Sequence, residues 1–332
     1  GTFGELSAEA VLTVTEPDGR HTQYSYDPFG NRTRETITNI NNANATGGQP
    51  KAYGDYRYDY PPSSNRLEQV RYKPPGATDY TVLESFTYDG VGRIDTRTKN
   101  GVTTDYEFDD RGLLTQVSRP GLTARYTYDA LGVRKTKTVN GQTTRYVTAP
   151  LFGLPHVLMT LDSGNTITNS FVFGGQQPLI EQPAAGSDRY LLPGGTVGNI
   201  THAMTDTGAI ENQYRYGAFG TRSAVTESAL GTEFGYTGQQ HDEESGLLYL
   251  RARYYDPGLG RFVSLDPYLG RLGEPVSQNR FIYVHNNPLI YADPSGLCRN
   301  ISYWSGHCVE TTNEEGVAIL AAIGTAALTV YT

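Results

Sequence analysis

The chain has 332 residues and a formal net charge of −8, with 37% hydrophobic and 19% charged residues. The negative charge argues against a sequence-independent nucleic-acid binder, which needs a basic face, and an aromatic content of 11% argues against disorder. Two cysteines exclude a disulfide scaffold. The unusual count is 25 tyrosines against 11 phenylalanines and one tryptophan. Because tyrosine favours strands, and 38 glycines and 18 prolines supply turns, the composition predicts an all-β, turn-rich fold.

The first ten residues lack the basic start and the apolar stretch of a signal peptide. The chain also begins at glycine rather than methionine, so we expect it to be a piece of a longer protein.

A tyrosine–aspartate pair followed by a glycine turn recurs along the chain. Clear copies begin at Tyr26-Asp27, Tyr88-Asp89, Phe108-Asp109 and Tyr128-Asp129, a variant begins at Tyr58-Asp59, and degenerate copies begin at Tyr216-Gly217 and Tyr255-Asp256. From Asp89 to Asp109 to Asp129 the spacing is 20 residues. A fixed period of this length is typical of an architecture that stacks one structural unit many times.

The copy at residues 125–141 indicates what each unit builds. Its Arg-Tyr-Thr-Tyr run alternates, so a strand would present tyrosine on one face. Asp129 can accept hydrogen bonds from backbone donors two residues on, Gly132 can take a positive φ, and a second strand then runs back to the hairpin signal Asn140-Gly141. Each copy is therefore a predicted β-hairpin, and stacked hairpins make one continuous sheet. We interpret the repeated residues as architectural, with tyrosine rings along one wall of a partly wet interior.

Beyond the clear repeats, the rhythm of strands and turns continues through residues 151–236. Residues 40–50 and 184–187 are predicted loops. Helix signals are confined to a helical turn near residues 239–245 and to the apolar tail of the chain.

Two long motifs in the last third of the chain carry a resemblance to a known family. The first is residues 246–267, Gly-Leu-Leu-Tyr-Leu-Arg-Ala-Arg-Tyr-Tyr-Asp-Pro-Gly-Leu-Gly-Arg-Phe-Val-Ser-Leu-Asp-Pro, and the second is residues 286–297, Asn-Asn-Pro-Leu-Ile-Tyr-Ala-Asp-Pro-Ser-Gly-Leu. They resemble the Rhs-associated core, and the Tyr-Asp hairpins resemble the YD repeats of Rhs proteins, of the B and C subunits of bacterial Tc toxins, and of teneurins. The resemblance covers residues 10–297.

This resemblance implies a hollow spiral β-shell of stacked hairpins, with a core domain that spirals inward and plugs one end. It also implies a variable C-terminal toxin that is held inside and is cut from the shell by the core, acting as an aspartyl protease. We therefore expect a shell segment over residues 1–236, a core domain with the protease motif over 237–297, and the start of the toxin or cargo over 298–332. In relatives the cut follows the leucine of an Asp-Pro-x-Gly-Leu motif, which here is the bond between Leu297 and Cys298.

Aspartyl proteolysis needs two carboxyl groups that share a proton, one ionised as the base for water and one protonated as the acid. The two motifs offer Asp256, Asp266 and Asp293. By resemblance, Asp266 and Asp293 are the catalytic pair, and Arg261 is the third member, which orients a carboxylate or lowers its pKa. Asp293 precedes Leu297 by four residues, so a tight Pro-Ser-Gly turn can bring the cut bond back to it.

Turn formation is the alternative role for these carboxylates. Asp-Pro pairs commonly start turns, three of them occur here, and Asp256 also matches the ordinary turn of the repeat. In addition, the segment 268–277 departs from the family pattern and is a few residues longer, which bears on how the two aspartates are placed.

Other candidate sites carry weaker signals. Residues 241–244, His-Asp-Glu-Glu, could bind a cation, but we interpret them as an exposed polar turn. No His/Cys spacing matches a zinc site and no glycine-rich loop joins a strand to a helix, so we expect no metal and no cofactor. Cys298 and Cys308 would form a bridge in an oxidising compartment and free thiols in a cytosol, and a nucleophilic pair of Cys298 with His307 is a further alternative.

After Leu297 the tyrosine–glycine rhythm stops. Residues 314–331 are a predicted short apolar helix with acidic residues at its start, as the helix dipole prefers. Its apolar run, 317–331, is shorter than the roughly 20 residues that a spanning helix needs. As part of the cargo, this segment is either a hydrophobic anchor inside the shell or a membrane-active segment for translocation or pore formation.

The predicted function is therefore the C-terminal part of an Rhs toxin shell, which encloses its own C-terminal toxin and releases it by autoproteolysis. The implied partners are that toxin, the remaining N-terminal shell, and a secretion-system spike, immunity protein or chaperone, with no nucleic acid bound by the shell and a membrane met only through residues 317–331. Such proteins are made in the bacterial cytoplasm and delivered to target cells by an injection or secretion system. The alternatives are a non-catalytic surface or adhesion scaffold and a carbohydrate-binding repeat protein.

Overall fold

The computed structural model describes residues 10–15, 20–39, 51–226, 231–297 and 301–302. The expectations for the loop 40–50, for Cys298, His307 and Cys308, and for the apolar tail lie outside these residues. Within them the chain folds into strands and three short 3-10 helices, so the predicted all-β fold is confirmed.

The larger sheet, called the shell sheet below, has nineteen strands: β1 (Ala10–Thr15), β2 (Arg20–Tyr26), β3 (Arg32–Asn39), β4 (Gly54–Asp59), β5 (Gln69–Lys73), β6 (Thr81–Tyr88), β7 (Ile94–Lys99), β8 (Val102–Phe108), β9 (Leu114–Arg119), β10 (Leu122–Tyr128), β11 (Arg134–Val139), β12 (Gln142–Leu151), β13 (Leu154–Leu161), β14 (Ile167–Gly174), β15 (Gln177–Pro183), β16 (Arg189–Gly194), β17 (Asn199–Met204), β18 (Ile210–Tyr216) and β19 (Arg222–Thr226).

Residues 231–297, called the plug below, hold a second sheet of β20 (Gln240–Asp242), β21 (Leu247–Leu250), β22 (Arg253–Asp256) and β23 (Arg261–Phe262). The 3-10 helices are η1 (Tyr236–Gly238), η2 (Pro275–Gln278) and η3 (Val284–Asn286). The last strand of the plug, β24 (Tyr291–Ala292), pairs with β25 (Ile301–Ser302). The domain boundaries after residues 236 and 297 stay predictions.

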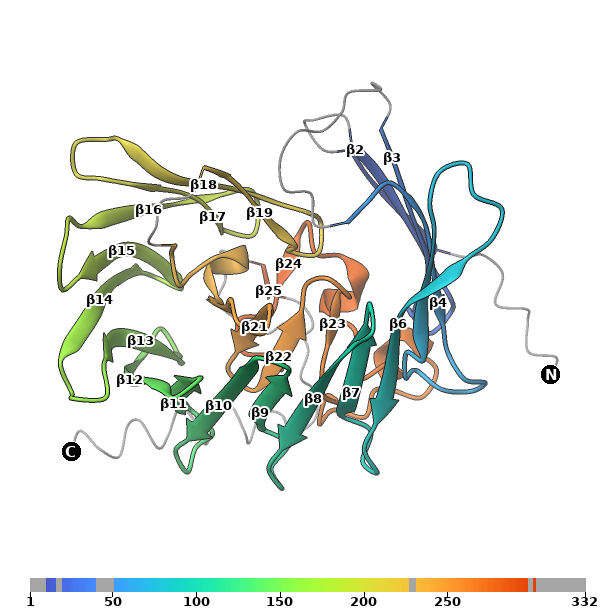
Figure 1. The fold of residues 1–332 in the computed structure, drawn as a ribbon, viewed down its shortest axis with the longest axis horizontal. Helices are drawn as coiled ribbons and strands as arrows, with labels where there is room; N and C mark the ends of the chain where they lie inside the picture. Colours follow the sequence, from blue (N-terminus) through green and yellow to red (C-terminus); the bar gives the residue numbers. More distant parts are fainter. Residues whose placement is uncertain (1–9, 16–19, 40–50, 227–230, 298–300, 303–332) are drawn as a thin grey trace.

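Each strand of the shell sheet pairs antiparallel with the next strand along the chain. The sheet curves around the plug, which fills its concave side (Figure 1). Its two ends meet through side chains: Phe219, in the turn between β18 and β19, packs edge-on against Tyr24 of β2 at 5.2 Å between ring centroids. The guanidinium of Arg32 lies 4.3 Å from the same Phe219 ring. The ring of strands is therefore joined at this point by aromatic and cation–π packing.

The repeat turns form as the sequence predicts. In the turn between β10 and β11, Asp129 Oδ1 accepts hydrogen bonds from the backbone N–H groups of Leu131 at 3.0 Å and Val133 at 2.9 Å. Gly132 has a φ of +79°, which a residue with a Cβ rarely adopts. The same aspartate-to-backbone pattern recurs at Asp27, Asp89, Asp109 and Asp162.

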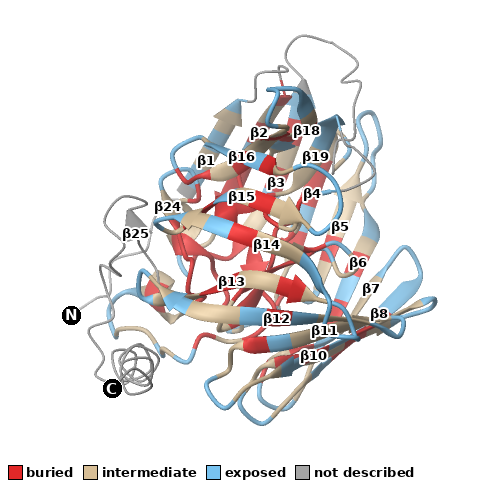
Figure 2. Cartoon of the chain, turned by 90° about the vertical axis from the view of Figure 1, so that its left-hand side faces the viewer, coloured by how far each residue is buried: buried red, intermediate tan, exposed pale blue. Residues whose placement is uncertain are grey.

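The tyrosine ladder is buried by the plug, which differs from the partly wet interior that we expected. Along β10, Tyr126 is buried while its neighbours Arg125 and Thr127 are exposed, as alternation requires. The Tyr126 ring packs on Tyr254 of the plug at 5.3 Å between centroids. Figure 2 shows the same pattern across the sheet, with exposed hairpin tips and buried positions along the strands. The shell supplies the rings and the plug covers them.

The helical turn predicted near residues 239–245 is found only from Asp242 onward, where the N–H groups of Ser245 and Gly246 both donate to the Asp242 carbonyl oxygen; the first half of the segment is a strand. Gln240–Asp242 is strand β20, which pairs with β21 across a turn closed by the Gly246 N–H to Asp242 O hydrogen bond of 2.8 Å. The apolar strand β21 pairs with residues 240–242, and this strand pairing outweighs the local helix signal.

The interpretation of residues 241–244 as an exposed turn is wrong at Asp242. This carboxylate is 1% exposed, forms an ion pair with Arg134 of β11, and lies 3.0 Å from Lys137 Nζ of the same strand. The Arg134 guanidinium also donates to Tyr254 Oη at 3.0 Å and lies over the Tyr249 ring at 4.2 Å. A buried cluster of charges therefore fastens the plug to the shell sheet.

We expect Asp242→Asn to lower the free energy of unfolding by about 3–5 kcal/mol, because it leaves the buried Arg134 cation without its carboxylate. Urea or thermal unfolding measures the loss. The matched control is Arg71→Met, which removes an ion pair with Asp59 whose side chains are 36% and 27% exposed and should cost less than about 1 kcal/mol. Equal losses in the two variants would contradict the role of the buried cluster.

Acid should also weaken this attachment. Burial alone would raise the pKa of Asp242, but the Arg134 and Lys137 cations outweigh burial and hold the pKa below its ordinary value. Such a carboxylate stabilises the fold above its unfolded pKa, and the stabilisation is lost as the pH falls through the folded pKa. We expect the melting temperature to fall below about pH 4, with a shallower fall in Asp242→Asn. A melting temperature that stays constant in acid would contradict this expectation.

Candidate functional site

The structure brings Asp266 and Asp293 to one guanidinium group. Asp266 follows β23 and Asp293 follows β24; their exposed fractions are 5% and 0%. Arg253, at the start of β22, has its Nη2 atom 2.9 Å from Asp266 Oδ2 and 3.8 Å from Asp293 Oδ2. Two carboxylates that are 27 residues apart in the sequence thus lie on the same buried cation.

Arg261 lies elsewhere, although we expected it beside the pair. Its Nη1 donates to Tyr60 Oη at 2.9 Å and its Nη2 donates to the carbonyl oxygen of Asn65, so both contacts are with the shell segment between β4 and β5. Among the described residues, the ion pairs of Asp266 and Asp293 are with Arg253. The place that we expected Arg261 to take beside the two carboxylates is held by Arg253.

A signal for Arg253 was present in the sequence. The strand alternates, so Arg253 and Tyr255 of β22 share a face, and Tyr255 is a core residue that packs on Phe262. The guanidinium carbon of Arg253 lies 3.6 Å from the centre of the Phe262 ring. An arginine on an inward-facing strand position must find anions or carbonyl groups, because a buried charge without partners is costly.

The loop from Asp293 to Leu297 folds back on the Asp293 side chain. Asp293 Oδ1 accepts hydrogen bonds from the Gly296 N–H at 2.9 Å, the Ser295 hydroxyl at 3.1 Å and the Leu297 N–H at 3.2 Å. We call residues 293–297 the cleavage loop. The N–H of the residue predicted to precede the cut is therefore hydrogen-bonded to a carboxylate of the candidate pair, while Cys298 lies outside the described residues.

Gly296 lets this loop approach the plug closely. Its φ is +73°, and a Cβ at this position would lie 2.9 Å from the backbone nitrogen of Arg253 and still closer to the carbonyl oxygen of Leu250. The Gly296 carbonyl oxygen accepts a hydrogen bond from Arg253 Nε. One arginine therefore contacts both carboxylates and the backbone of the cleavage loop.

Two neighbouring groups respond to the charges of the pair. Burial raises the pKa of Tyr283, and the Asp293 carboxylate raises it further; the Asp293 N–H lies 3.4 Å from the Tyr283 hydroxyl oxygen. Burial lowers the pKa of Arg280, the Asp266 carboxylate opposes this effect, and the Arg253 cation adds to it. The site thus holds two carboxylates together with two arginine cations and a neutral phenol.

A cavity of about 640 Å³ opens beside the cleavage loop. Leu297, Arg253 and Arg280 line it from the plug, and the repeat turns at Gly112 and Gly132 line it from the shell sheet. Water in this cavity can therefore reach Ser295 and Leu297 of the cleavage loop. In the part of the chain that the structure describes, no group of three or more His, Cys, Asp or Glu residues could hold a metal ion, and no helix is long and apolar enough to cross a membrane.

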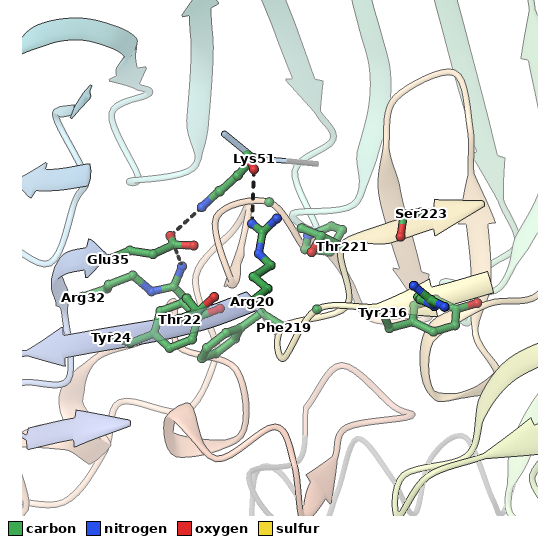
Figure 3. Close-up of a pocket in the computed structure, with 14 residues that line it drawn as sticks. Arg20, Thr22, Tyr24, Arg32, Glu35, Lys51, Tyr216, Phe219, Thr221 and Ser223 are labelled. Carbon is green, nitrogen blue, oxygen red and sulfur yellow. Dashed lines mark hydrogen bonds and ion pairs between the residues drawn. The ribbon is translucent and has the colours of Figure 1, made fainter. Parts of the chain in front are cut away.

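A second, smaller pocket lies between β2–β3 and β18–β19 (Figure 3). It has a volume of about 30 Å³, and Glu35 there contacts Lys51 at 2.6 Å and Arg32 at 3.4 Å. Burial alone would raise the pKa of Glu35, but Lys51 and Arg32 outweigh it and lower the pKa. The Glu35 carboxylate is paired with both Lys51 and Arg32, and the space suits one water molecule, so we take the cleavage loop and its cavity as the candidate site.

Comparisons with known proteins agree with this architecture. A family model described as Teneurin YD-shell matches residues 8–289. The tRNA nuclease WapA of Bacillus subtilis strain 168 is 33% identical over 299 residues, which are 89% of this chain and 12% of that protein. The toxin protein Tse5 of Pseudomonas aeruginosa is 52% identical over 62 residues, 19% of this chain and 4% of that protein. This chain therefore spans only a small part of the length of these relatives.

Among solved structures, a crystal structure of TcdB2-TccC3 has a similar fold. The TM-score is 0.51 at 18% identity, over 86% of this chain and 18% of that chain. At this identity the likeness concerns the fold alone.

Gly296→Ala should destabilise the plug, because the new methyl group would meet the backbone of Arg253 and Leu250 at a positive φ. We expect a loss of about 1–3 kcal/mol in the free energy of unfolding, measured by urea titration. The control is Gly121→Ala, which has a φ of +81° but open space around the added Cβ. If both variants lose the same stability, the close approach at Gly296 is not what restricts this position.

Proposed function

Because this chain belongs to the teneurin YD-shell family, we propose that it is the C-terminal part of a toxin shell whose plug cuts the chain between Leu297 and Cys298. The observation that carries the proposal is the pair of buried carboxylates on Arg253, of which one also binds the N–H of Leu297. The relatives named as a nuclease and as a toxin support a shell that carries a harmful cargo. Residues 298–332 would then be the start of that cargo.

The two aspartates divide the chemistry. Aspartyl proteolysis uses one carboxyl group as the base for water and a second as the acid. Asp266 has the closer ion pair with Arg253, at 2.9 Å, and is assigned as the base. Asp293, whose Oδ2 atom lies 3.8 Å from that nitrogen, is assigned as the acid. Arg253 orients both groups and holds the Gly296 carbonyl.

The reaction is the addition of water to the Leu297 carbonyl. Asp266 removes a proton from water as the water oxygen attacks the carbonyl carbon, and Asp293 donates its proton to the carbonyl oxygen. When the tetrahedral intermediate collapses, the carbon–nitrogen bond breaks and the carbonyl re-forms, which returns the proton to Asp293. Asp266 gives its proton to the departing nitrogen of Cys298. The products are a carboxyl group at Leu297 and an amine at Cys298.

A second function keeps the same fold without chemistry. Asp293 Oδ1 accepts three hydrogen bonds within its own loop, as an aspartate that only shapes a turn also does. This observation favours a non-catalytic scaffold, in which the chain stays continuous across Leu297–Cys298.

Delivery and partners follow from the first function. The shell would enclose its own C-terminal toxin, continue into further N-terminal shell strands, and reach target cells by an injection or secretion system after synthesis in a bacterial cytoplasm. A spike, immunity protein or chaperone would meet the assembled particle rather than the buried carboxylate pair.

The test is to replace Asp266 or Asp293 by asparagine in the purified chain. After denaturation, intact-mass measurement and N-terminal sequencing should find a peptide that starts at Cys298 in the wild type and lose at least 95% of it in either variant, because asparagine can act neither as acid nor as base. The control is Asp162→Asn, which changes an equivalent turn aspartate between β13 and β14, outside the lining of the cavity beside the cleavage loop, and should be cut normally. Release by the asparagine variants would refute the assignment of the pair, and an uncut wild type would favour the scaffold.

A further inference from the structure

Arg251 occupies a turn position that suits glycine. It lies with Ala252 between β21 and β22, where Leu250 pairs with Arg253 across the hairpin. Its φ is +64°, in the left-handed region that side chains with a Cβ disfavour. An arginine held in such a conformation indicates that its side chain is needed there.

The Arg251 side chain contacts three separate parts of the molecule. Its Nε donates to the carbonyl oxygen of Pro155 in shell strand β13 at 2.9 Å. Its Nη1 donates to Gln239 Oε1 of the plug at 2.7 Å and to the carbonyl oxygen of Pro294 in the cleavage loop. One guanidinium therefore spans the shell wall, the plug and the loop that carries the proposed cut.

The turn itself adds a second contact with the loop. The Ala252 N–H donates to the Ser295 carbonyl oxygen at 3.1 Å. Gln239 is in turn held in place, because its Nε2 donates to the Thr237 carbonyl at 2.9 Å. Hydrogen bonds from Arg251 and from the neighbouring Ala252 thus fix the position of the cleavage loop.

The hydrogen-bond partners of Arg251 are uncharged oxygen atoms, which suits a residue that positions the loop rather than one that neutralises a charge. Burial lowers the pKa of Arg251 to about 10, while Tyr249 and Asp293 oppose this effect, so the group stays charged at neutral pH. A planar guanidinium can direct separate N–H groups at the carbonyls of Pro155 and Pro294, whereas an ammonium group is a compact point charge.

We propose that Arg251 is a positioning residue that ties the cleavage loop to strand β13, so that the protease is assembled only where the shell wall is in place. The inference rests on the proposed function and deepens it. If β13 moves away from the plug, the guanidinium loses its shell partner and the loop loses the anchor at Pro294. The cut would then wait until the shell sheet has closed around the plug.

The experiment compares Arg251→Gly with Arg251→Lys. Glycine accepts the positive φ and removes the guanidinium, so the turn should persist while the loop loses its anchor. We expect cleavage at Leu297 to slow by at least about tenfold in Arg251→Gly and by less in Arg251→Lys, followed by the appearance of the peptide that starts at Cys298.

Rescue separates positioning from a merely structural role. Arg251 and Pro155 line the cavity of about 640 Å³, which gives a small cation access to the vacated place. Methylguanidinium added to Arg251→Gly should restore part of the cleavage rate. The matched control is Lys137→Met, which removes another contact between shell and plug, to Asp242 and Glu244, but does not touch the loop. It should be cut at nearly the wild-type rate and show no response to methylguanidinium.

A folded Arg251→Gly that is cut at the wild-type rate would overturn the proposal, as would equal slowing without rescue in Arg251→Gly and Lys137→Met. Hydrogen exchange of the Gly296 and Leu297 amides provides a readout that does not need cleavage. In the Asp266→Asn background, Arg251→Gly should speed exchange of these amides by at least about tenfold, and unchanged exchange would overturn the tie. An uncut wild type together with faster exchange would refute the proposed function and keep the tie.

Discussion

The apolar inner face of a curved sheet must be shielded from water. In this molecule the plug shields it, and the contacts between plug and shell sheet determine most of the remaining structure. Nineteen strands that pair only with their sequence neighbours give a strip with one exposed concave side. Tyrosines on that side are too large and apolar to leave in water, and their hydroxyl groups still need partners. The plug satisfies both needs: Tyr254 meets the ring of Tyr126 and accepts a hydrogen bond from Arg134. The same contacts therefore bury the tyrosine rings and attach the plug to the shell sheet.

Ion pairs between the shell sheet and the plug determine how the plug is positioned. Arg134 with Asp242, a fully buried pair, and Arg97 with Asp256 at 2.8 Å, a partly buried pair, join the shell sheet to the plug. Such pairs add less net stability than apolar packing would, but they penalise any arrangement that leaves a charge alone. The same rule operates at the candidate site, where Arg253 holds two carboxylates and a loop carbonyl. The candidate site thus uses a buried arginine paired with carboxylates, as the contacts between shell sheet and plug do.

The sequence was informative wherever one segment decides its own structure. The turn at Asp129, Gly132 and the strand before it were predictable, because the acceptor, the positive φ and the alternation all lie within a few residues. The partners of Asp242 and Arg253 were not predictable, because they come from distant segments of the chain; strand alternation marks Arg253 as inward-facing but does not identify the carboxylates that it meets. Arg261 was selected by resemblance, yet its contacts are with Tyr60 and Asn65, about 200 residues earlier in the chain. Contacts between such distant residues form only when the plug packs against the shell sheet, so the local sequence does not reveal them.

Much of the hold on the cleavage loop acts through its main chain. The N–H groups of Gly296 and Leu297 and the carbonyl groups of Pro294, Ser295 and Gly296 all take part in hydrogen bonds. Main-chain contacts of this kind depend on the shape of the backbone rather than on the identity of the side chains. Different C-terminal segments could therefore be joined after Leu297 by recombination without redesign of the site, and the plug would present each of them in the same way.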